Sequence, residues 1–393
     1  MSNLRKVEFS EFGEIITGKT PSSAHPEDFG NEIPFITPSD SFDQKYINST
    51  QRYLSSEGVR KLKGKLLPEN SVLVTCIGSA MGKVAMTKTP SITNQQINAI
   101  KINKNFDPAY IYYCLKNNYK LLRNAAGGST ALPLLNKTEF ERLSCNTHIN
   151  KSEQEKISLA LSLIDKRIDL NSRINAELEA MAKTLYDYWF VQFDFPDANG
   201  KPYKTSGGKM EYNATLKREI PAGWNSCKLS EFIKLEYGKP LKSEYRTGSG
   251  YPVFGSSGIV GFHVDYLVEG PGLIIGRKGT VGKVNYSFEN FYPIDTAYYV
   301  SCKKITSMIF LNYLINSLGL EGMNSDSAVP GLNREATLDI SIVSAPLELI
   351  SKYHEYAESW FEKKKIIVEE NNALIKLRDW LLPMLMNGQV TVR

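Results

Sequence analysis

The chain has 393 residues, of which 42% are hydrophobic and 23% charged, and its formal net charge is +5. This length exceeds what one hydrophobic core usually organises, so we expect at least two domains, and the composition excludes a disordered or fibrous protein. No uncharged apolar run approaches the ~20 residues needed to span a bilayer. The first residues, MSNLRKVEFSEFGE, lack the apolar core of a secretory signal. The five cysteines are widely spaced and form no Cys-x-x-Cys pair, as is typical of thiols in a reducing cytoplasm.

The first half of the chain predicts a small mixed domain followed by a long helix. Ser71–Thr75 is an apolar, β-rich run between proline and glycine, and it predicts a buried strand. Asp107–Leu115 has helical spacing, with Asp107 as a candidate cap. Glu153–Phe190 contains no proline or glycine and predicts one long amphipathic helix. Asp194–Trp224 is rich in Gly, Pro, Lys and Ser, and predicts a linker along the surface.

The second half predicts the same order of elements. Gly272–Gly276 predicts a buried strand, and Ser307–Ser317 predicts a helix. A second long amphipathic stretch runs from about Leu347 to Leu382. Short strands and helices among glycine-rich turns favour a compact α+β domain in each half.

Similarity between the halves indicates an internal duplication. The matching segments occur in the same order, at offsets that fall from 220 to 200 and then to 197. They are Glu11-Phe12-Gly13 with Glu231-Phe232-Ile233, Gly18-Lys19-Thr20-Pro21 with Gly238-Lys239-Pro240, Leu66–Met86 with Tyr266–Tyr286, and Leu135-Asn136-Lys137 with Leu332-Asn333-Arg334. Loops absorb insertions whereas strands do not, so this drift is what two copies of one unit would produce.

Each long helix carries apolar residues at alternating intervals of four and three, the spacing of a coiled-coil seam. The seam comprises Ile157, Leu161, Ile164, Ile168, Leu178 and Leu185 in the first helix, and Ile350, Ala357, Trp360, Ile367, Leu374 and Leu381 in the second. Asn171 and Asn175 interrupt the first seam and would fix its register at some cost in stability. At ~1.5 Å rise per residue each helix would be about 55 Å long. We expect the two helices to pack antiparallel; the alternative is that each covers only its own globular part.

These elements together predict the fold class and the domain division. The expected fold is α+β, with two similar globular α/β domains separated by an antiparallel two-helix coiled coil in a pseudo-two-fold arrangement. The expected parts are a first domain at residues 1–150, a first long helix at 151–193, a linker at 194–225, a second domain at 226–346, and a second long helix with a tail at 347–393.

The sequence offers no motif for catalysis. Gly13–Thr20, GEIITGKT, matches the phosphate-loop pattern G-x-x-x-x-G-K-T, but Pro21 and Pro26 argue against the helix that such a loop requires. The histidines are scattered without metal-ligand spacing, and the chain contains neither an Asn/Asp-Pro-Pro-Tyr motif nor a G-x-G cofactor loop. We therefore expect no catalytic residue, no metal site and no cofactor in this chain.

The candidate DNA-binding residues lie in polar loops at equivalent places in both halves. Lysines and glycine N–H groups suit phosphates, while Gln, Asn and Arg suit base edges. The candidates are Lys19, Thr20, Ser79, Lys83, Gln95, Gln96, Ser129, Thr130 and Asn136 in the first half, and Lys239, Ser256, Ser257, Arg277, Lys278, Thr280, Lys283, Asn333 and Arg334 in the second. For any one of them, the alternative is a solvated side chain at the tip of a turn.

Four sequence segments indicate a resemblance to a known family. They are LSEF…GK at Leu229–Lys239, whose first-half counterpart ends in Gly18-Lys19-Thr20-Pro21, DYWFVQFDFPDANGKPYKTSGGKM at Asp187–Met210, LKREIPAGW at Leu216–Trp224, and LRDWLLPMLMNGQV at Leu377–Val390. Together with the duplication and the two long helices, they give a sequence that resembles the specificity (S) subunit of type I restriction–modification systems over essentially its whole length.

The resemblance implies a non-catalytic protein of the cytoplasm that binds double-stranded DNA. Each of its two target-recognition domains would read one half of a split, asymmetric site, and the helices would set the unread spacer. The implied partners are two methyltransferase (M) subunits that use S-adenosylmethionine, and restriction (R) subunits that use ATP and Mg²⁺. Two alternatives remain open: an adaptor with two protein-binding domains, and a fused restriction-class methyltransferase or nuclease.

Overall fold

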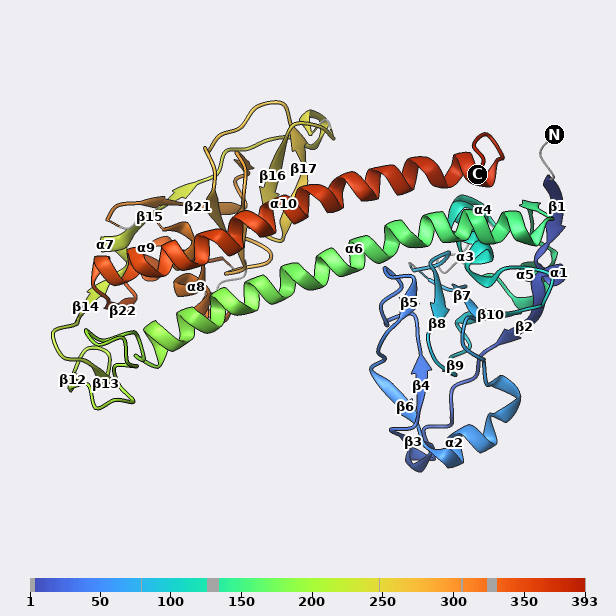
Figure 1. Ribbon diagram of the computed structural model, residues 1–393, viewed down its shortest axis with the longest axis horizontal. Helices are drawn as coiled ribbons and strands as arrows, with labels where there is room; N and C mark the ends of the chain where they lie inside the picture. Colours follow the sequence, from blue (N-terminus) through green and yellow to red (C-terminus); the bar gives the residue numbers. More distant parts are fainter. Residues whose placement is uncertain are drawn as a thin grey trace. The chain divides into compact units, whose positions relative to one another are not determined.

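The computed structural model describes residues 4–78, 80–125, 134–246, 248–304, 307–323 and 331–392 (Figure 1). The chain forms two compact units, Met1–Asn171 with Glu370–Arg393, and Ser172–Glu369. The division falls inside both long helices, α6 (Lys151–Tyr186) and α10 (Leu347–Met386). Each unit therefore contains a globular part and one segment of each long helix. The domain boundaries at 150, 193, 225 and 346 stay a prediction.

The globular part of the first unit is built on a five-stranded sheet. Its strands, in sheet order, are β2 (Gly13–Thr17), β10 (Ile97–Ile102), β7 (Val72–Thr75), β8 (Val84–Thr87) and β5 (Tyr46–Ile47). Neighbouring strands are antiparallel, except that β5 and β8 run parallel. All residues of β7 are buried, which confirms the strand predicted at Ser71–Thr75.

A second sheet and several short helices complete this globular part. The second sheet has the order β3 (Phe29–Gly30), β6 (Arg52–Leu54), β4 (Ile33–Ile36) and β9 (Ile92–Thr93), and a separate pair joins β1 (Leu4–Glu8) to β11 (Ser144–His148). The α-helices are α1 (Phe9–Phe12), α2 (Ser56–Lys61), α3 (Pro108–Asn117), α4 (Tyr119–Asn124) and α5 (Lys137–Arg142). The predicted cap of α3 is confirmed, because the Asp107 carboxylate accepts a hydrogen bond from the Tyr110 N–H at 2.7 Å.

The second unit contains the same framework. Its main sheet has the order β15 (Ile233–Tyr237), β21 (Ala297–Cys302), β18 (Gly272–Gly276) and β19 (Val284–Ser287), its second sheet the order β17 (Gly258–His263), β16 (Tyr251–Gly255) and β20 (Tyr292–Pro293), and a separate pair joins β14 (Asn225–Lys228) to β22 (Ser341–Ser344). The short α-helices are α7 (Leu229–Phe232), α8 (Met308–Ser317) and α9 (Arg334–Leu338). The predicted strand Gly272–Gly276 and the predicted helix Ser307–Ser317 are both confirmed.

The strand register confirms the duplication and corrects its alignment by one residue. In the first unit, Ile97 of β10 pairs with Thr75, whereas in the second unit Ala297 pairs with Gly276. The strands β7 and β18 are therefore related by 201 positions, although the sequence match at Leu66–Met86 gives 200. The hairpin that follows is one residue longer in the first unit, and a loop absorbs such a difference at little cost. Cys76, and not Ile77, is consequently the equivalent of Arg277.

The two long helices contact each other within each unit, and they run antiparallel. In the first unit Asp165 Oδ1 lies 3.1 Å from Arg378 Nη1, and Asn171 Nδ2 lies 2.9 Å from Asn371 Oδ1. In the second unit Lys364 Nζ lies 2.6 Å from Glu179 Oε2. Every predicted seam residue is buried or half-buried, namely Ile157, Leu161, Ile164, Ile168, Leu178, Leu185, Ile350, Ala357, Trp360, Ile367, Leu374 and Leu381.

The long helices also enter the globular cores. Ile157 and Leu161 of α6, with Leu382 and Leu385 of α10, belong to the core of the first unit that surrounds Phe9. In the second unit, the hydroxyl of the fully buried Tyr353 donates to the Ala182 carbonyl at 3.0 Å. The two packing modes weighed from the sequence therefore coexist: each helix segment contacts its partner helix and also covers a globular part.

The segment Asp194–Trp224, predicted to be a linker along the surface, has folded structure of its own. It contains an antiparallel hairpin of β12 (Met210–Asn213) and β13 (Arg218–Pro221). The Phe195 ring stacks on Trp224 and on Tyr203, with centroids 5.0 and 4.7 Å apart. The composition obscures this fold, because aromatic residues far apart in the segment pack together only when the turns between them have formed.

Across the described ranges, no helix is both long enough and apolar enough to cross a lipid bilayer.

Candidate nucleic-acid interface

Four loops of the first unit meet at one end of its main sheet. The Lys19 N–H donates to the Thr93 carbonyl at 2.9 Å, which joins the loop after β2 to the loop before β10. The Cys76 N–H donates to the Gln96 carbonyl at 2.8 Å, and the Leu135 N–H to the Cys76 carbonyl at 2.9 Å. We call residues 18–20, 76–78, 93–96 and 134–136 loop cluster 1.

Four loops of the second unit meet in the same way. The Lys239 N–H donates to the Pro293 carbonyl at 3.0 Å. The Arg277 N–H donates to the Thr296 carbonyl at 2.9 Å, and the Leu332 N–H to the Arg277 carbonyl at 2.9 Å. We call residues 238–239, 276–278, 293–296 and 331–334 loop cluster 2. The duplication therefore repeats a loop arrangement as well as a sheet.

The paired Gly-Lys turns have a structural cause. A Cβ atom at Gly18 would lie 2.1 Å from the Thr93 carbonyl oxygen, and one at Gly238 would lie 2.2 Å from the Ile294 carbonyl oxygen. Only glycine permits this approach of the loop to the neighbouring strand end. The lysine that follows is exposed in both units, so each loop cluster presents an ammonium group at the same place. The chain between β2 and the 3₁₀ turn Pro26–Asp28 is not a helix, in agreement with the rejection of a phosphate-binding loop.

Loop cluster 1 presents hydroxyl and amide groups. The Thr20 hydroxyl donates to Gln95 Oε1 at 2.7 Å, and Asn94 Nδ2 donates to Gln96 Oε1 at 3.0 Å. Gln95 is exposed, and its side-chain amide nitrogen has two N–H groups that can donate to a ligand. These hydroxyl and amide groups are neutral, and they suit hydrogen bonding to base edges.

Next to these loops, the half-buried Thr17 and the buried Cys76 and Asn98 of the first unit form a neutral triad. The Thr17 hydroxyl donates to Asn98 Oδ1 at 2.6 Å, and Asn98 Nδ2 lies 3.2 Å from Cys76 Sγ and 3.4 Å from the Leu135 carbonyl oxygen. Burial raises the pKa of the Cys76 thiol to about 12, so this thiol is neutral at physiological pH. The contact of Asn98 Nδ2 with the Leu135 carbonyl oxygen joins this triad to the loop at Leu135.

The equivalent triad of the second unit is aromatic and cationic. The Arg277 guanidinium lies over the Tyr237 ring at 4.8 Å and over the Tyr298 ring at 5.7 Å, and Nη1 donates to the Asp295 carbonyl at 3.1 Å. The Tyr298 hydroxyl donates to the Leu332 carbonyl at 3.1 Å, the same support that Asn98 gives to Leu135. Burial, with the neighbouring Tyr237, raises the pKa of Tyr298, while Arg277 opposes this shift.

The remaining candidate side chains are spread over several places. Asn136 and Asn333 cap α5 and α9, accepting hydrogen bonds from the backbone N–H groups of Glu139 and Ala336 at 2.9 and 3.0 Å. Lys83 contacts Asp43 at 3.1 Å, and the equivalent Lys283 donates to the Ser257 carbonyl at 2.8 Å.

Other candidates lie near the clusters or outside the described part. Lys278, Thr280 and Ser257 are exposed, Ser256 is half-buried, and Arg334 donates to the Leu235 carbonyl at 2.7 Å. Ser79, Ser129 and Thr130 lie outside the described residues. Which candidates touch DNA stays a prediction.

Several residues of the two triads escaped the sequence reasoning. Tyr237, Tyr298, Thr17, Cys76 and Asn98 lie within strands or at their ends, where they resemble core positions. The duplication could have identified them. When the two copies are aligned, these are positions at which the side chains of the two halves differ in chemical type. The one-residue shift between β7 and β18 conceals the match of Cys76 with Arg277.

A polar network in the first unit connects the globular part to the long helices. Lys45 Nζ donates to Ser162 Oγ at 2.7 Å and lies 4.6 Å from the centre of the Tyr113 ring. The Tyr113 hydroxyl donates to Asp165 Oδ2 at 2.5 Å, and Arg378 contacts the other oxygen of Asp165. Burial lowers the pKa of Lys45 to about 8, while the carboxylate of Asp165 opposes this shift. The network fixes the globular part on its helices and is not part of loop cluster 1.

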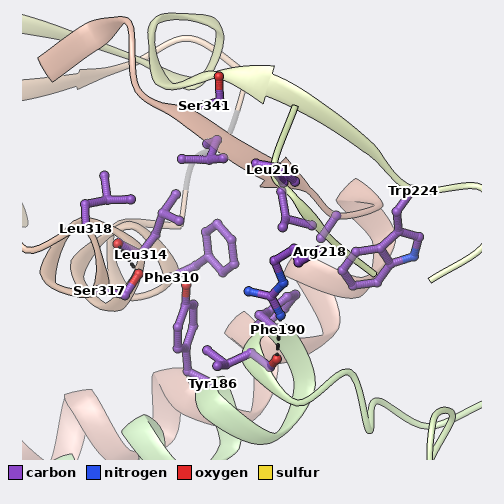
Figure 2. A pocket seen from close by; sticks show the side chains of 14 residues that line it. Tyr186, Phe190, Leu216, Arg218, Trp224, Phe310, Leu314, Ser317, Leu318 and Ser341 are labelled. Carbon is purple, nitrogen blue, oxygen red and sulfur yellow. Dashed lines mark hydrogen bonds between the residues drawn. The ribbon is translucent and has the colours of Figure 1, made fainter. Parts of the chain in front are cut away.

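A cavity of about 210 Å³ in the second unit differs from the loop clusters in the chemistry of its lining (Figure 2). Its lining is mainly apolar and comes from the end of α6, from α8, from β22 and from the hairpin. The Arg218 guanidinium stacks on Phe193 at 4.7 Å and donates to the Val191 carbonyl at 3.0 Å. Because the guanidinium is engaged and the walls are apolar, we do not assign this cavity to nucleic acid.

Comparison with known proteins gives consistent matches. A family profile described as the type I restriction modification DNA specificity domain matches residues 1–180 and 221–347. Over 412 aligned positions the chain is 26% identical to the type I restriction enzyme MjaIX specificity subunit of Methanocaldococcus jannaschii, covering 97% of this chain and 92% of that protein. Over 140 positions it is 38% identical to the HindI specificity subunit of Haemophilus influenzae, covering 35% of this chain and 30% of that protein.

A solved structure shares the fold. The type I restriction–modification S subunit from M. genitalium superposes with a TM-score of 0.62 at 19% identity, covering 98% of this chain and 96% of that chain. The profile match spans most of this sequence and includes the loop cluster of each unit. The chain therefore belongs to the type I restriction–modification DNA specificity family.

Proposed function

We propose that loop cluster 1 and loop cluster 2 are the two DNA-contacting regions of this chain, each facing one half of a split target. As a member of its family, the chain recognises target DNA and acts as a non-catalytic component of a type I restriction–modification complex. The observation that supports the two regions most directly is the repeated meeting of four loops, with an exposed lysine at the same place in each. The adaptor and fused-enzyme alternatives receive no support from the comparisons.

Both kinds of DNA contact are available in each loop cluster. Lys19 and Lys239 are exposed, and their ammonium groups suit phosphate oxygens, which are the same at every DNA sequence. The amide of Gln95 in one cluster and the guanidinium of Arg277 in the other suit base edges. Such a division of labour, with phosphate contacts for position and base contacts for sequence, is the general pattern in DNA recognition.

The long helices would set the spacing between the half-sites. At ~1.5 Å per residue, the 36 residues of α6 and the 40 residues of α10 correspond to lengths of about 54 and 60 Å. Half-site separation in a two-part reader follows from the geometry of the protein. We propose that these helices determine how many base pairs remain unread.

The chain acts with M and R subunits of its system. We propose two M subunits, one for each half-site, because each half of the duplication repeats the same framework. S-adenosylmethionine would be bound by the M subunits, and ATP and Mg²⁺ by the R subunits. A protein that directs methylation of chromosomal DNA would work in the cytoplasm.

The proposal is tested by mapping N6-methyladenine at base resolution in cells that carry this chain with its M subunits. We expect one split motif with a fixed gap. A methylome without any such motif, in cells where the complex assembles, would contradict the proposed function.

Matched lysines test the contact regions themselves. We expect Lys19→Ala with Lys239→Ala to weaken DNA binding by the purified complex at all sequences, and to reduce the slope of log K against log salt by about 0.9 per lysine. Lys104→Ala with Lys303→Ala is the control. These exposed lysines lie just after the ends of β10 and β21, whereas the loop clusters lie where these two strands begin. Equal effects of both pairs would argue against the loop clusters.

A further inference from the structure

The positions in the two loop clusters fall into two classes. At some positions both units carry the same group in the same place: Lys19 and Lys239 follow equivalent glycines, and their N–H groups make equivalent bonds to the Thr93 and Pro293 carbonyls. At others the chemistry changes completely between the units. An asymmetric target has the same backbone in both halves but different bases. Groups that repeat therefore suit phosphates, and groups that change suit bases.

The strongest change occurs at the triads. Asn98 pairs with Thr17 across the sheet, and Tyr298 pairs with Tyr237 at the same register position. The third member is Cys76 in the first unit and Arg277 in the second. Three positions that lie next to one another have thus changed together, from neutral side chains in the first unit to two tyrosines and an arginine in the second.

The Arg277 guanidinium is held by neighbouring groups, and among the described residues no carboxylate pairs with its charge. Its Cζ atom lies 4.8 and 5.7 Å from the centres of the Tyr237 and Tyr298 rings, and Nη1 donates to the Asp295 carbonyl. Among the described residues Arg277 forms no ion pair, and the second guanidinium over Tyr237, that of Arg334 at 5.6 Å, forms only a long one of 3.9 Å with Glu335. A planar fork held in one orientation next to a second positive charge is suited to an electronegative, planar partner.

We infer that Arg277 is a specificity-determining residue that donates to the O6 and N7 acceptors of a guanine in one half of the target. This inference rests on the proposed function. Arginine to guanine is the commonest specific contact in the major groove, and it uses the fixed fork that the tyrosines support. Tyr237 and Tyr298 are positioning residues: their rings contact the guanidinium and do not read the base. The first unit has a neutral thiol at the equivalent position, so its half-site is read by other groups.

The test uses the full chain with its M subunits and the methylated motif as readout. We expect wild type to require guanine at one position of one half-site. Arg277→Gln should lower the preference for guanine at that position about tenfold or more, and favour adenine there, because glutamine pairs with adenine edges. The other half of the motif and the spacer should not change.

Arg277→Lys separates a base contact from a phosphate contact. Lysine keeps the charge but loses the planar fork, so a base reader should lose discrimination, whereas a phosphate contact should be largely retained. Arg218→Ala is the matched control, since Arg218 also stacks on an aromatic ring and donates to a backbone carbonyl but lies outside loop cluster 2. We expect Arg218→Ala to leave the motif unchanged at every position.

Two outcomes would overturn the inference. One is an unchanged motif with Arg277→Gln. The other is a uniform loss of methylation over all sequences that Arg277→Lys restores. If a variant no longer methylates DNA, competition between duplexes that differ at one base pair measures the same discrimination from binding by the purified complex. A wild-type complex without any split motif would instead refute the proposed function.

Discussion

Lys45 is a half-buried cation at the point where β5 meets α3 and α6. Its ordinary pKa of 10.5 falls to about 8 in the fold, chiefly because burial disfavours the charged form. Between these two values the unfolded chain binds more protons than the folded chain. The free energy of unfolding therefore rises with pH across this window through Lys45, and below about pH 8 the fold carries the full cost of the buried charge.

Replacing Lys45 by methionine should remove this dependence. We expect the stability of Lys45→Met relative to wild type to fall by on the order of 2 kcal/mol between pH 7 and pH 10, because only the wild type gains from the loss of the proton. Urea denaturation at several pH values measures the difference. Lys63→Met, at an exposed lysine, is the control. Parallel stability curves for Lys45→Met and wild type would contradict the assignment.

Individual residues were predictable where the signal is local. The Asp107 cap depends on its own backbone and the next turn, and the sequence predicts it. The triad of Tyr237, Arg277 and Tyr298 depends on strand register, which a one-residue difference in hairpin length alters. Asn136 and Asn333 illustrate the intermediate case: their repeated position was recognised, but the structure shows helix capping, and any contact with DNA stays a prediction.

Among the elements, the long helices contain a pair of asparagines that face each other within a mainly apolar seam. Asn171 Nδ2 donates to Asn371 Oδ1 at 2.9 Å. Polar pairs of this kind fix register at a cost in stability. We expect the double variant Asn171→Leu, Asn371→Leu to unfold at a higher temperature, while its helices tolerate alternative registers.

The single variant Asn171→Leu provides the contrast. It breaks the bond and places a leucine against the remaining amide, so we expect a lower unfolding temperature than in wild type. Thermal unfolding of the purified chain with its M subunits measures both changes. A double variant less stable than wild type would show that the asparagine pair stabilises the helices.

Helix length gives a second prediction at this scale. We expect removal of four residues from each helix, between the Asn171–Asn371 and Glu179–Lys364 contacts, to shorten each helix by about 6 Å. The methylated motif should then lose one or two base pairs of its spacer, since B-DNA rises ~3.4 Å per base pair. Replacing the same residues by alanine without deletion is the control. An unchanged spacer in the deletion variant would refute the proposed role of the helices.

Periodicity and composition differ in what they reveal about elements. The long helices, β7 and α3 were predicted because their apolar spacing is a property of the segment itself. The hairpin of β12 and β13 was not, because Asp194–Trp224 is rich in glycine, proline and lysine, a composition typical of linkers. Its order comes from the stack of Phe195, Tyr203 and Trp224, which is a tertiary contact.

For the whole molecule, the duplication predicts that the two halves of the target are separable. Exchange of residues 1–149 for the same segment of another family member should change one half of the methylated motif and leave the other half and the spacer intact. The donor segment must keep apolar residues that fit Leu161 and Leu382, because both enter the core of the first unit. Methylome mapping measures the result, and a change in both halves would contradict separate readers.

The sequence predicts the duplication at this scale but not the limits of the compact units. Repeated strings identify two copies, and the natural division then falls at the ends of the long helices. The structure divides the chain inside those helices, at Asn171 and Glu370. This division depends on which side chains of a continuous helix reach which core, and helical spacing alone does not specify that.

The place of Leu382 and Leu385 in the first unit has a consequence for biosynthesis. Their neighbours in that core, from Val7 to Leu161, leave the ribosome first, and roughly 220 residues must be added before Leu382 is made. At ~5–20 residues per second this delay is on the order of 10–40 s. During that interval the nascent first unit exposes an unfilled apolar site, where a chaperone would bind until α10 arrives.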